Sequence, residues 1–259
     1  MVKVLPVTFR NHKGELLRGF VHVPPRYNSA QGVAIVFLHG FPGSMFGTAA
    51  RMLSVLGRAG FLCLRFEFSG TNTSEGKFEE KLMSKEVNEV GFAIDFLQNK
   101  YGFKELVLIG HSTGAIDAGL YAHTDKRITG LVLSGCTSDL LHAVRYDFSD
   151  VEVREFWRRG FIRYHRKNHW VDGKKLKKEF YDEFFTLDLP EALRKFRKPV
   201  LIVHGEKDEG VPVFNAREVY KMMRGRKKLM IVREADHSYS KRTYAGEVVS
   251  AVLKFIGSL

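Results

Sequence analysis

Six runs of consecutive apolar residues, separated by segments long enough to form helices, constrain the fold of this 259-residue chain most strongly. Unbroken Val, Ile and Leu runs predict strands covered on both faces, as in a parallel sheet. The runs are "GVAIVFLHG" (32–40), "GFLCLRFEF" (60–68), "ELVLIGHS" (105–112), "GLVLSGC" (130–136), "PVLIVHG" (199–205) and "KLMIVREADH" (228–237). Helices are predicted at Phe46–Arg58, Met83–Lys100, Thr113–His123, Asn215–Met223 and Arg242–Ile256. We therefore expect an α/β protein with a mostly parallel, doubly wound sheet.

The N-terminal stretch "LPVTFRNHKGELLRGFVHVP" (5–24) has a different pattern. Two strand-like segments flank the turn residues Asn11–Gly14. This arrangement predicts an antiparallel hairpin at the edge of the sheet.

The alternation of strands and helices is interrupted between residues 137 and 197, a segment rich in aromatic residues. Structureless loops of that length are rare, so we expect a helical cap insertion between the two parts of the core, 1–136 and 198–259. Within it, Trp157, Phe161 and Tyr164 have the spacing of one helix face and are candidate substrate-binding residues. The basic residues Arg159, Arg163 and Lys167 would form a second face of that helix, either simply solvated or attracting anionic substrates.

The net charge of +12 is concentrated in this insertion. Ten basic residues and only two acidic ones lie between Arg154 and Lys178. We do not expect nucleic acid or an anionic membrane surface as a partner, because the aromatic residues that stacking would need are better explained as the core of the cap.

Other features indicate the protein's environment. No apolar stretch approaches the roughly 20 residues of a membrane span, and the N-terminal residues lack the apolar region of a signal peptide, so a cytoplasmic protein is expected. Cys63 and Cys136 lie in apolar runs without metal-like spacing and are expected to be buried free thiols. The low glutamine content beside 41 Lys and Arg is compatible with a thermophilic host. The sequence is compatible with a homodimer.

The strand "LVLIG" (106–110) ends in the pentapeptide Gly110-His111-Ser112-Thr113-Gly114. Gly-x-Ser-x-Gly between a strand and a helix predicts a nucleophile elbow, in which serine occupies the tip of a tight, strained turn. The glycines let strand and helix approach closely, and the helix places its positive end near the serine. Ser112 is therefore the candidate nucleophile.

A nucleophilic serine needs a base and an acid that orients the base, and in this architecture they follow in the order serine, acid, histidine. Asp208 follows the strand of 199–205, and His237 follows the last strand. Both lie at carboxyl ends of strands, the edge where open α/β sheets bind ligands. Glu206 and Glu209 are competing candidates for the acid, whereas Asp236 is expected to be a loop carboxylate.

The stretch "FLHGFPGS" (37–44) predicts an oxyanion hole. A turn after His39 would aim the backbone N–H of Phe41 toward the serine, and the N–H of Thr113 would supply the second donor. The alternative is a simple Gly-Pro-rich turn. His39, His111 and His204 also follow strands and are expected to be packing or turn residues, because no acid partner is apparent for them.

Together, "HGFPGS", "GHSTG", "HGEKDEGVP" and "ADHSY" resemble the α/β-hydrolase superfamily, in the same order and over nearly the whole chain. The segment "LRFEFSGTNTSEGKFEE" (64–80) resembles small prokaryotic carboxylesterases of the cinnamoyl or feruloyl esterase group. Two departures stand out: Glu67 replaces the usual aspartate, and Asn72 replaces a glycine. Asn tolerates a left-handed backbone nearly as well as Gly, so the turn is expected to survive.

The resemblance implies an α/β-hydrolase fold and a serine carboxylesterase that uses Ser112, Asp208 and His237. It implies a small-molecule ester substrate with a short-chain or aryl acyl group, and no metal or organic cofactor. A serine peptidase, a lipase and a non-catalytic anion- or nucleic-acid-binding protein on the same scaffold remain alternatives.

Overall fold

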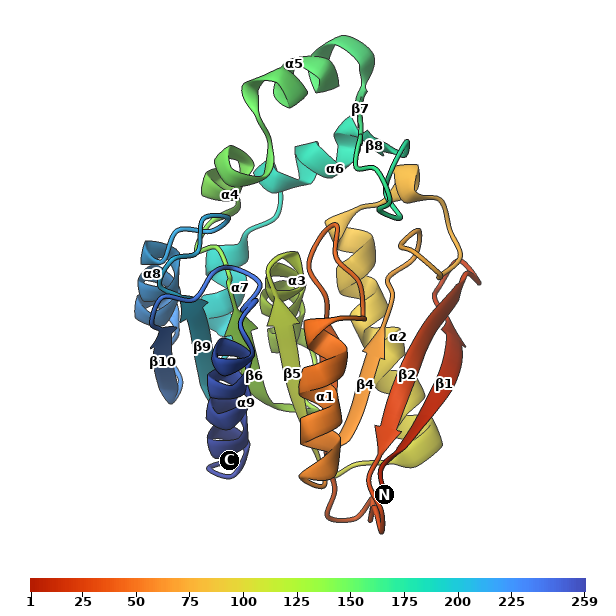
Figure 1. The fold of residues 1–259 in the computed structure, drawn as a ribbon, viewed down its shortest axis with the longest axis vertical. Coiled ribbons are helices and arrows are strands. Elements are labelled where there is room, and N and C mark those ends of the chain that lie inside the picture. Colours follow the sequence, from red (N-terminus) through yellow and green to blue (C-terminus); the bar gives the residue numbers. More distant parts are fainter.

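A computed structural model describes residues 1–259, and its centre is an eight-stranded sheet with the order β1-β2-β4-β3-β5-β6-β9-β10 (Figure 1). The strands are β1 (Lys3–Arg10), β2 (Leu16–Val23), β3 (Val33–Leu38), β4 (Leu62–Phe66), β5 (Glu105–His111), β6 (Ile128–Ser134), β9 (Val200–Gly205) and β10 (Lys227–Val232). β2 pairs antiparallel with both β1 and β4, and the other pairs are parallel. The predicted fold class and the edge hairpin are confirmed.

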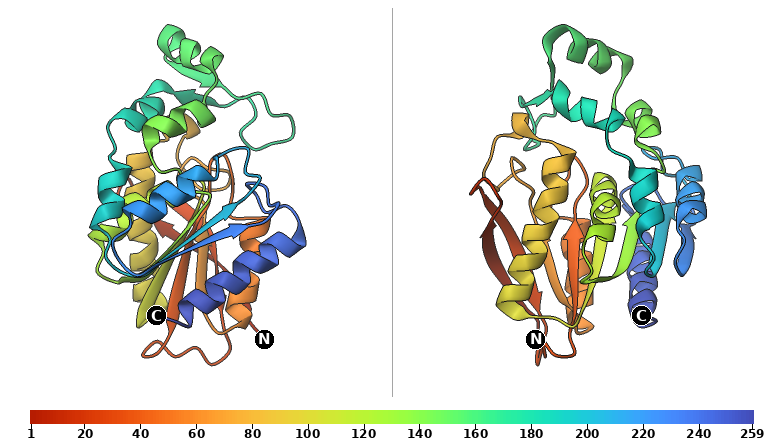
Figure 2. Two further views of the ribbon diagram at one scale, coloured as in Figure 1. Left: turned by 90° about the vertical axis from the view of Figure 1, so that its left-hand side faces the viewer. Right: turned by 180° about the vertical axis from the view of Figure 1, so that it is seen from behind.

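Helices cover both faces of this sheet (Figures 1 and 2). One face carries α1 (Thr48–Arg58) and α9 (Arg242–Ile256). The other face carries α2 (Met83–Tyr101), α3 (Thr113–Tyr121), α7 (Leu189–Lys195) and α8 (Phe214–Met222). Three short 3₁₀ segments are η1 (Phe78–Glu80), η2 (Ala122–Thr124) and η3 (Glu183–Phe185).

Strand β5 shows why the sheet needs both helical layers. Its side chains alternate between the faces, so Leu106 and Leu108 pack with the α2–α3 layer while Val107 and Ile109 pack with the α1–α9 layer. All four are buried. Continuous apolar runs in the sequence therefore correspond to strands that contact protein on both faces.

The insertion lies over the carboxyl ends of the parallel strands, at the top of Figure 1. It contains α4 (Leu140–Asp147), α5 (Asp150–Arg159), β7 (Phe161–Arg163), β8 (Lys175–Lys177) and α6 (Lys178–Asp182), followed by η3 and α7. α7 packs against α3 and α8. By its contacts, α7 therefore belongs to the helical layer beside the sheet.

The predicted amphipathic helix through Trp157, Phe161 and Tyr164 is wrong. α5 ends at Gly160, which adopts a left-handed conformation with φ 75° and closes the helix through its N–H to the Phe156 carbonyl. Glycine favours this conformation because it lacks a Cβ. The chain then turns into an antiparallel pair of strands, β7 and β8.

Two further sequence features can be compared with the structure. Cys63 and Cys136 are buried and unpaired, as predicted. None of the helices combines the length and the apolar character that crossing a bilayer requires.

Candidate active site

Ser112 lies between the end of β5 and the start of α3, with φ 56° and ψ −126°. Non-glycine residues rarely adopt a positive φ, so this conformation is strained and has to be held by its surroundings. A Cβ at Gly110 would lie 2.1 Å from the Gly114 carbonyl oxygen, and one at Gly114 would lie 2.3 Å from the Leu38 carbonyl oxygen. Both glycines are therefore needed for the close packing of strand, turn and helix.

Asp208 and His237 are brought together by the loops after β9 and β10. Asp208 Oδ2 lies 2.7 Å from His237 Nδ1, and Oδ1 accepts hydrogen bonds from the Gly210 and Val211 N–H groups at 3.0 and 2.7 Å. Burial alone would raise the pKa of Asp208, but hydrogen bonds from His204 and His237 hold it well below its usual range. Asp208 is therefore an ionised acceptor that fixes the His237 ring.

His204 is a second partner of this carboxylate, contrary to the prediction that it lacks one. Its Nε2 lies 3.2 Å from Asp208 Oδ2 and 2.8 Å from the Val211 carbonyl oxygen. His204 is fully buried. The competing acids Glu206 and Glu209 are exposed.

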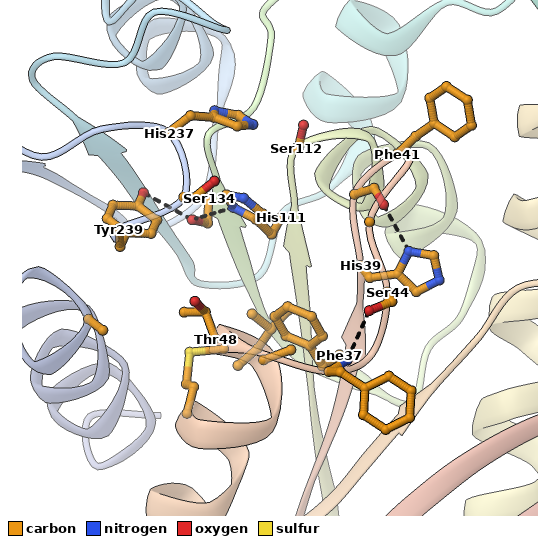
Figure 3. A pocket seen from close by; sticks show the side chains of 18 of the residues that line it. Phe37, His39, Phe41, Ser44, Thr48, His111, Ser112, Ser134, His237 and Tyr239 are labelled. Atoms are coloured by element: carbon orange, nitrogen blue, oxygen red, sulfur yellow. Dashed lines mark hydrogen bonds between the residues drawn. The ribbon is translucent and has the colours of Figure 1, made fainter. Parts of the chain in front are cut away.

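The His237 ring is turned toward the Ser112 hydroxyl (Figure 3). The His111 ring lies beside it, with 4.9 Å between centroids. A Cβ at Gly135 would lie 3.0 Å from His237 Cε1, so a glycine there leaves room for the ring. These contacts give the imidazole one orientation, with Nδ1 on Asp208 and Nε2 directed to the serine.

The turn after β3 contacts the serine directly. A Cβ at Gly40 would lie 2.7 Å from Ser112 Cβ. The next N–H, that of Phe41, has no acceptor within the chain. The N–H of Thr113 belongs to the first turn of α3, where donors have no intrahelical acceptor. Both predicted donors thus flank the nucleophile.

Aromatic side chains anchor the turn. The Phe41 ring lies 5.8 Å from Phe78, 5.8 Å from Tyr164 and 5.4 Å from Phe180, between ring centroids. Trp170 Nε1 donates to the Pro42 carbonyl oxygen at 3.2 Å. The insertion therefore holds the turn that carries the Phe41 N–H.

His39 is buried beneath the same turn. Its Nδ1 lies 2.9 Å from the Gly40 carbonyl oxygen, and its Nε2 accepts from the Phe68 N–H at 3.4 Å. Burial lowers its pKa to about 4. His39 also has an acid neighbour that the sequence did not reveal, Glu67, whose Oε2 lies 3.4 Å from His39 Nε2.

Glu67, one of the two departures noted in the sequence, ties the turn to the segment after β4. Its Oε1 accepts from the Met45 N–H at 3.3 Å and from Asn72 Nδ2 at 3.2 Å. Burial raises the pKa of Glu67 to about 7, against the lowering effects of these hydrogen bonds and of the charges on Arg65 and Lys81. Asn72, the second departure, has φ 43°, as expected for a residue in a glycine position.

A cavity of about 370 Å³ opens beside the nucleophile. Ser112, His111, Ser134, His237 and Tyr239 line it (Figure 3). No group of three or more His, Cys, Asp or Glu side chains in the chain is arranged to hold a metal ion.

The predicted cap residues do not line this cavity. Trp157 is 70% exposed, with Lys178 Nζ 4.1 Å from the centre of its ring. Phe161 is partly buried in β7, and Tyr164 packs on Phe41 and Phe78. The insertion instead contributes two other residues to the cavity lining, Arg166 and His169, which the sequence did not single out.

Known proteins share this arrangement of elements. The sequence model described as "Alpha/beta hydrolase family" matches residues 35–251. The chain belongs to this family. This confirms the resemblance seen in the sequence motifs.

Individual relatives of this α/β hydrolase are distant in sequence. A bifunctional esterase/perhydrolase from Acinetobacter calcoaceticus is 27% identical over 212 residues, which cover 69% of this chain and 75% of the relative. Est1E from Butyrivibrio proteoclasticus, solved with ferulic acid bound, superimposes with a TM-score of 0.81 at 22% identity, covering 97% of this chain and 99% of that one. The Pyrococcus furiosus esterase Pf2001 superimposes with a TM-score of 0.75 at 18% identity, covering 99% and 91%.

Proposed function

We propose that this α/β hydrolase is a serine carboxylesterase that hydrolyses esters of short-chain or aryl carboxylic acids through an acyl-enzyme. The observation that carries the proposal is the 2.7 Å contact of Asp208 Oδ2 with His237 Nδ1, with the His237 ring turned toward the strained Ser112 (Figure 3). Acid, base and nucleophile then have the relationship that activates a serine hydroxyl.

In the first half-reaction, Ser112 Oγ forms a bond to the ester carbonyl carbon while His237 Nε2 takes the hydroxyl proton. The carbonyl electron pair moves to its oxygen, and the Phe41 and Thr113 N–H groups stabilise the resulting oxyanion. When the bond to the alcohol oxygen breaks, His237 gives its proton to that oxygen. Asp208 stays ionised throughout and stabilises the His237 cation.

Water then attacks the acyl-enzyme by the same route. His237 takes a proton from the water, and the tetrahedral intermediate collapses to release the carboxylic acid and return the proton to Ser112. Every protein group that these two half-reactions use belongs to this chain.

The names of the relatives support esters, rather than other acyl compounds, as the proposed substrates of this protein. The Acinetobacter and Pyrococcus proteins are named as esterases, and Est1E was solved with ferulic acid, an aryl acid. The cavity beside Ser112 has a size within the range typical of small-molecule sites.

The test is the hydrolysis of p-nitrophenyl esters from acetate to decanoate, and of methyl ferulate, by the protein and by its Ser112→Ala variant. We expect turnover that is abolished in the variant. Equal turnover in both proteins would contradict the assignment of Ser112. An absence of turnover on every ester would contradict the esterase proposal.

A further inference from the structure

The cavity beside Ser112 extends over the α1–α9 face of the sheet, away from the aromatic core of the insertion. Its deeper lining comes from Ala49 and Met52 on α1 and from Ala245, Val248 and Val252 on α9. α9 starts shortly after the His237 loop and runs alongside the sheet away from the carboxyl ends of the strands, so its successive turns lie farther from the nucleophile (Figure 1). The cavity therefore extends between α1 and α9, away from Ser112.

Strand register forms the floor of the cavity in two layers. His111 of β5 pairs with Ser134 of β6 next to the nucleophile. Two residues earlier, Ile109 pairs with Phe37 of β3 on one side and Val132 of β6 on the other. Since side chains two residues apart share a face, both rows face the same helices. A group that enters from Ser112 meets a polar layer first and an apolar layer below it.

The polar layer is an internally hydrogen-bonded chain. Ser134 Oγ donates to Tyr239 Oη at 3.0 Å and lies 3.2 Å from His111 Nδ1 (Figure 3). Burial, assisted by the neighbouring His237, lowers the pKa of His111 to about 3, so this ring is neutral. No Asp, Glu or Lys lines the cavity, and Arg166, its one arginine, comes from the insertion. The interior is therefore suited to an uncharged group.

Small side chains keep the space open. Ala49 and Ala245 occupy helix positions where Leu or Phe would fill it. Protein interiors are normally close-packed, and an apolar void reduces stability. An apolar cavity that adjoins a candidate nucleophile is best explained as a binding site.

We propose that this cavity binds the acyl group of the substrate, and that it extends the range of substrates from esters of short-chain and aryl acids to esters of uncharged medium-chain and arylalkyl carboxylic acids. The inference rests on the proposed esterase function. The carbonyl is held at Ser112 between the Phe41 and Thr113 N–H groups, the first acyl carbons pass His111 and Ser134, and the apolar end packs between α1 and α9. Residues of these two helices then determine chain-length preference.

The experiment compares Ala49→Phe, which fills the cavity, with Ala50→Phe, a neighbouring α1 position that does not line it. For Ala49→Phe we expect kcat/KM on p-nitrophenyl decanoate to fall about tenfold or more, because excluding a single methylene of the substrate from an apolar pocket already lowers kcat/KM by about that factor. Hydrolysis of p-nitrophenyl acetate should fall less, so the ratio of decanoate to acetate hydrolysis drops at least several-fold, whereas Ala50→Phe should keep the wild-type ratio. Val252→Ala, which enlarges the apolar end, should shift the preference toward longer chains.

Binding of free decanoate, measured by the shift of the thermal unfolding midpoint, gives a readout that does not need turnover. Decanoate should stabilise the wild type, Ser112→Ala and Ala50→Phe, but not Ala49→Phe. Equal stabilisation of Ala49→Phe, or an unchanged chain-length profile in both Ala49→Phe and Val252→Ala, would overturn the cavity assignment. If decanoate binding is lost as expected but the wild type hydrolyses no ester, the cavity assignment stands and the esterase proposal fails.

Discussion

His204 Nε2 lies 3.2 Å from Asp208 Oδ2, the same carboxylate oxygen that lies 2.7 Å from His237 Nδ1. One oxygen atom thus has two imidazole neighbours, one fully buried and one at the cavity. The buried histidine also contacts the Val211 carbonyl, which belongs to the loop that donates an N–H to Asp208. His204 is therefore placed to hold both the acid and its loop.

We expect His204→Ala to lower the free energy of unfolding by about 2–4 kcal/mol, because it leaves a cavity and removes a partner from two buried acceptors. Because Asp208 would be less firmly held, kcat should fall more than KM changes. Urea unfolding and ester kinetics measure the two effects. Glu209→Ala, at an exposed position on the same loop, is the control and should match the wild type. A fully active, fully stable His204→Ala protein would contradict this role.

Glu67 predicts a pH dependence of stability. Its pKa is raised from 4.5 to about 7 in the folded protein, so folding favours the protonated form. The resulting stabilisation is fully present below the unfolded-state pKa and is lost as the pH rises through about 7. A shift of this size corresponds to about 3 kcal/mol. Urea unfolding across this pH range should show the decline in the wild type and a smaller one in Glu67→Gln. Glu247→Gln, at an exposed position on α9, should retain the full decline.

Asp117 on α3 is completely buried, and neither of its carboxylate oxygens has a hydrogen-bond partner. Burial, reinforced by the nearby Glu86, raises its pKa well above the usual value, so the folded protein holds it protonated. The folded state is thus favoured while the Asp117 carboxyl group is protonated, and this stabilisation is lost as the pH rises and the group ionises. We expect Asp117→Asn to match the wild type in acid and to become the more stable protein at alkaline pH, as measured by thermal unfolding. A variant that is less stable than the wild type at every pH would indicate an ionised, paired carboxylate.

Gly40→Ala tests the contact between the turn after β3 and the nucleophile. The added Cβ would lie 2.7 Å from Ser112 Cβ, so the turn has to move and the Phe41 N–H with it. A displacement of this kind is expected to lower kcat about 100-fold. Gly246→Ala is a matched control because nothing lies within 4 Å of its added Cβ on α9. It should leave kcat unchanged and stabilise the protein by about 1 kcal/mol. An unchanged kcat in Gly40→Ala would argue against this oxyanion turn.

The sheet was predictable because its signal is local. Each strand is an apolar run bounded by turn residues, and α9 begins and ends where the pattern predicts, at Arg242 and Ile256. The turn at Ser112 was predictable for the same reason: the steric need for Gly110 and Gly114 is contained within five residues.

Features that depend on tertiary packing were not predictable. Trp157 and Tyr164 fit one helical face in the sequence, but Gly160 between them reverses the chain. The pairing of His39 with Glu67 joins residues from two different strand ends. The cavity beside Ser112 arises from the register of three strands and the size of side chains on two helices, so no single segment contains its signal.

The hydrogen bond from Trp170 to the Pro42 carbonyl joins the insertion to the turn that carries the Phe41 N–H. Any outward swing of the insertion must either break this bond or pull the turn away from Ser112. If the bond holds, the turn follows the insertion, and if it breaks, the turn loses one of its anchors; the position of the insertion and the position of the Phe41 N–H are therefore coupled.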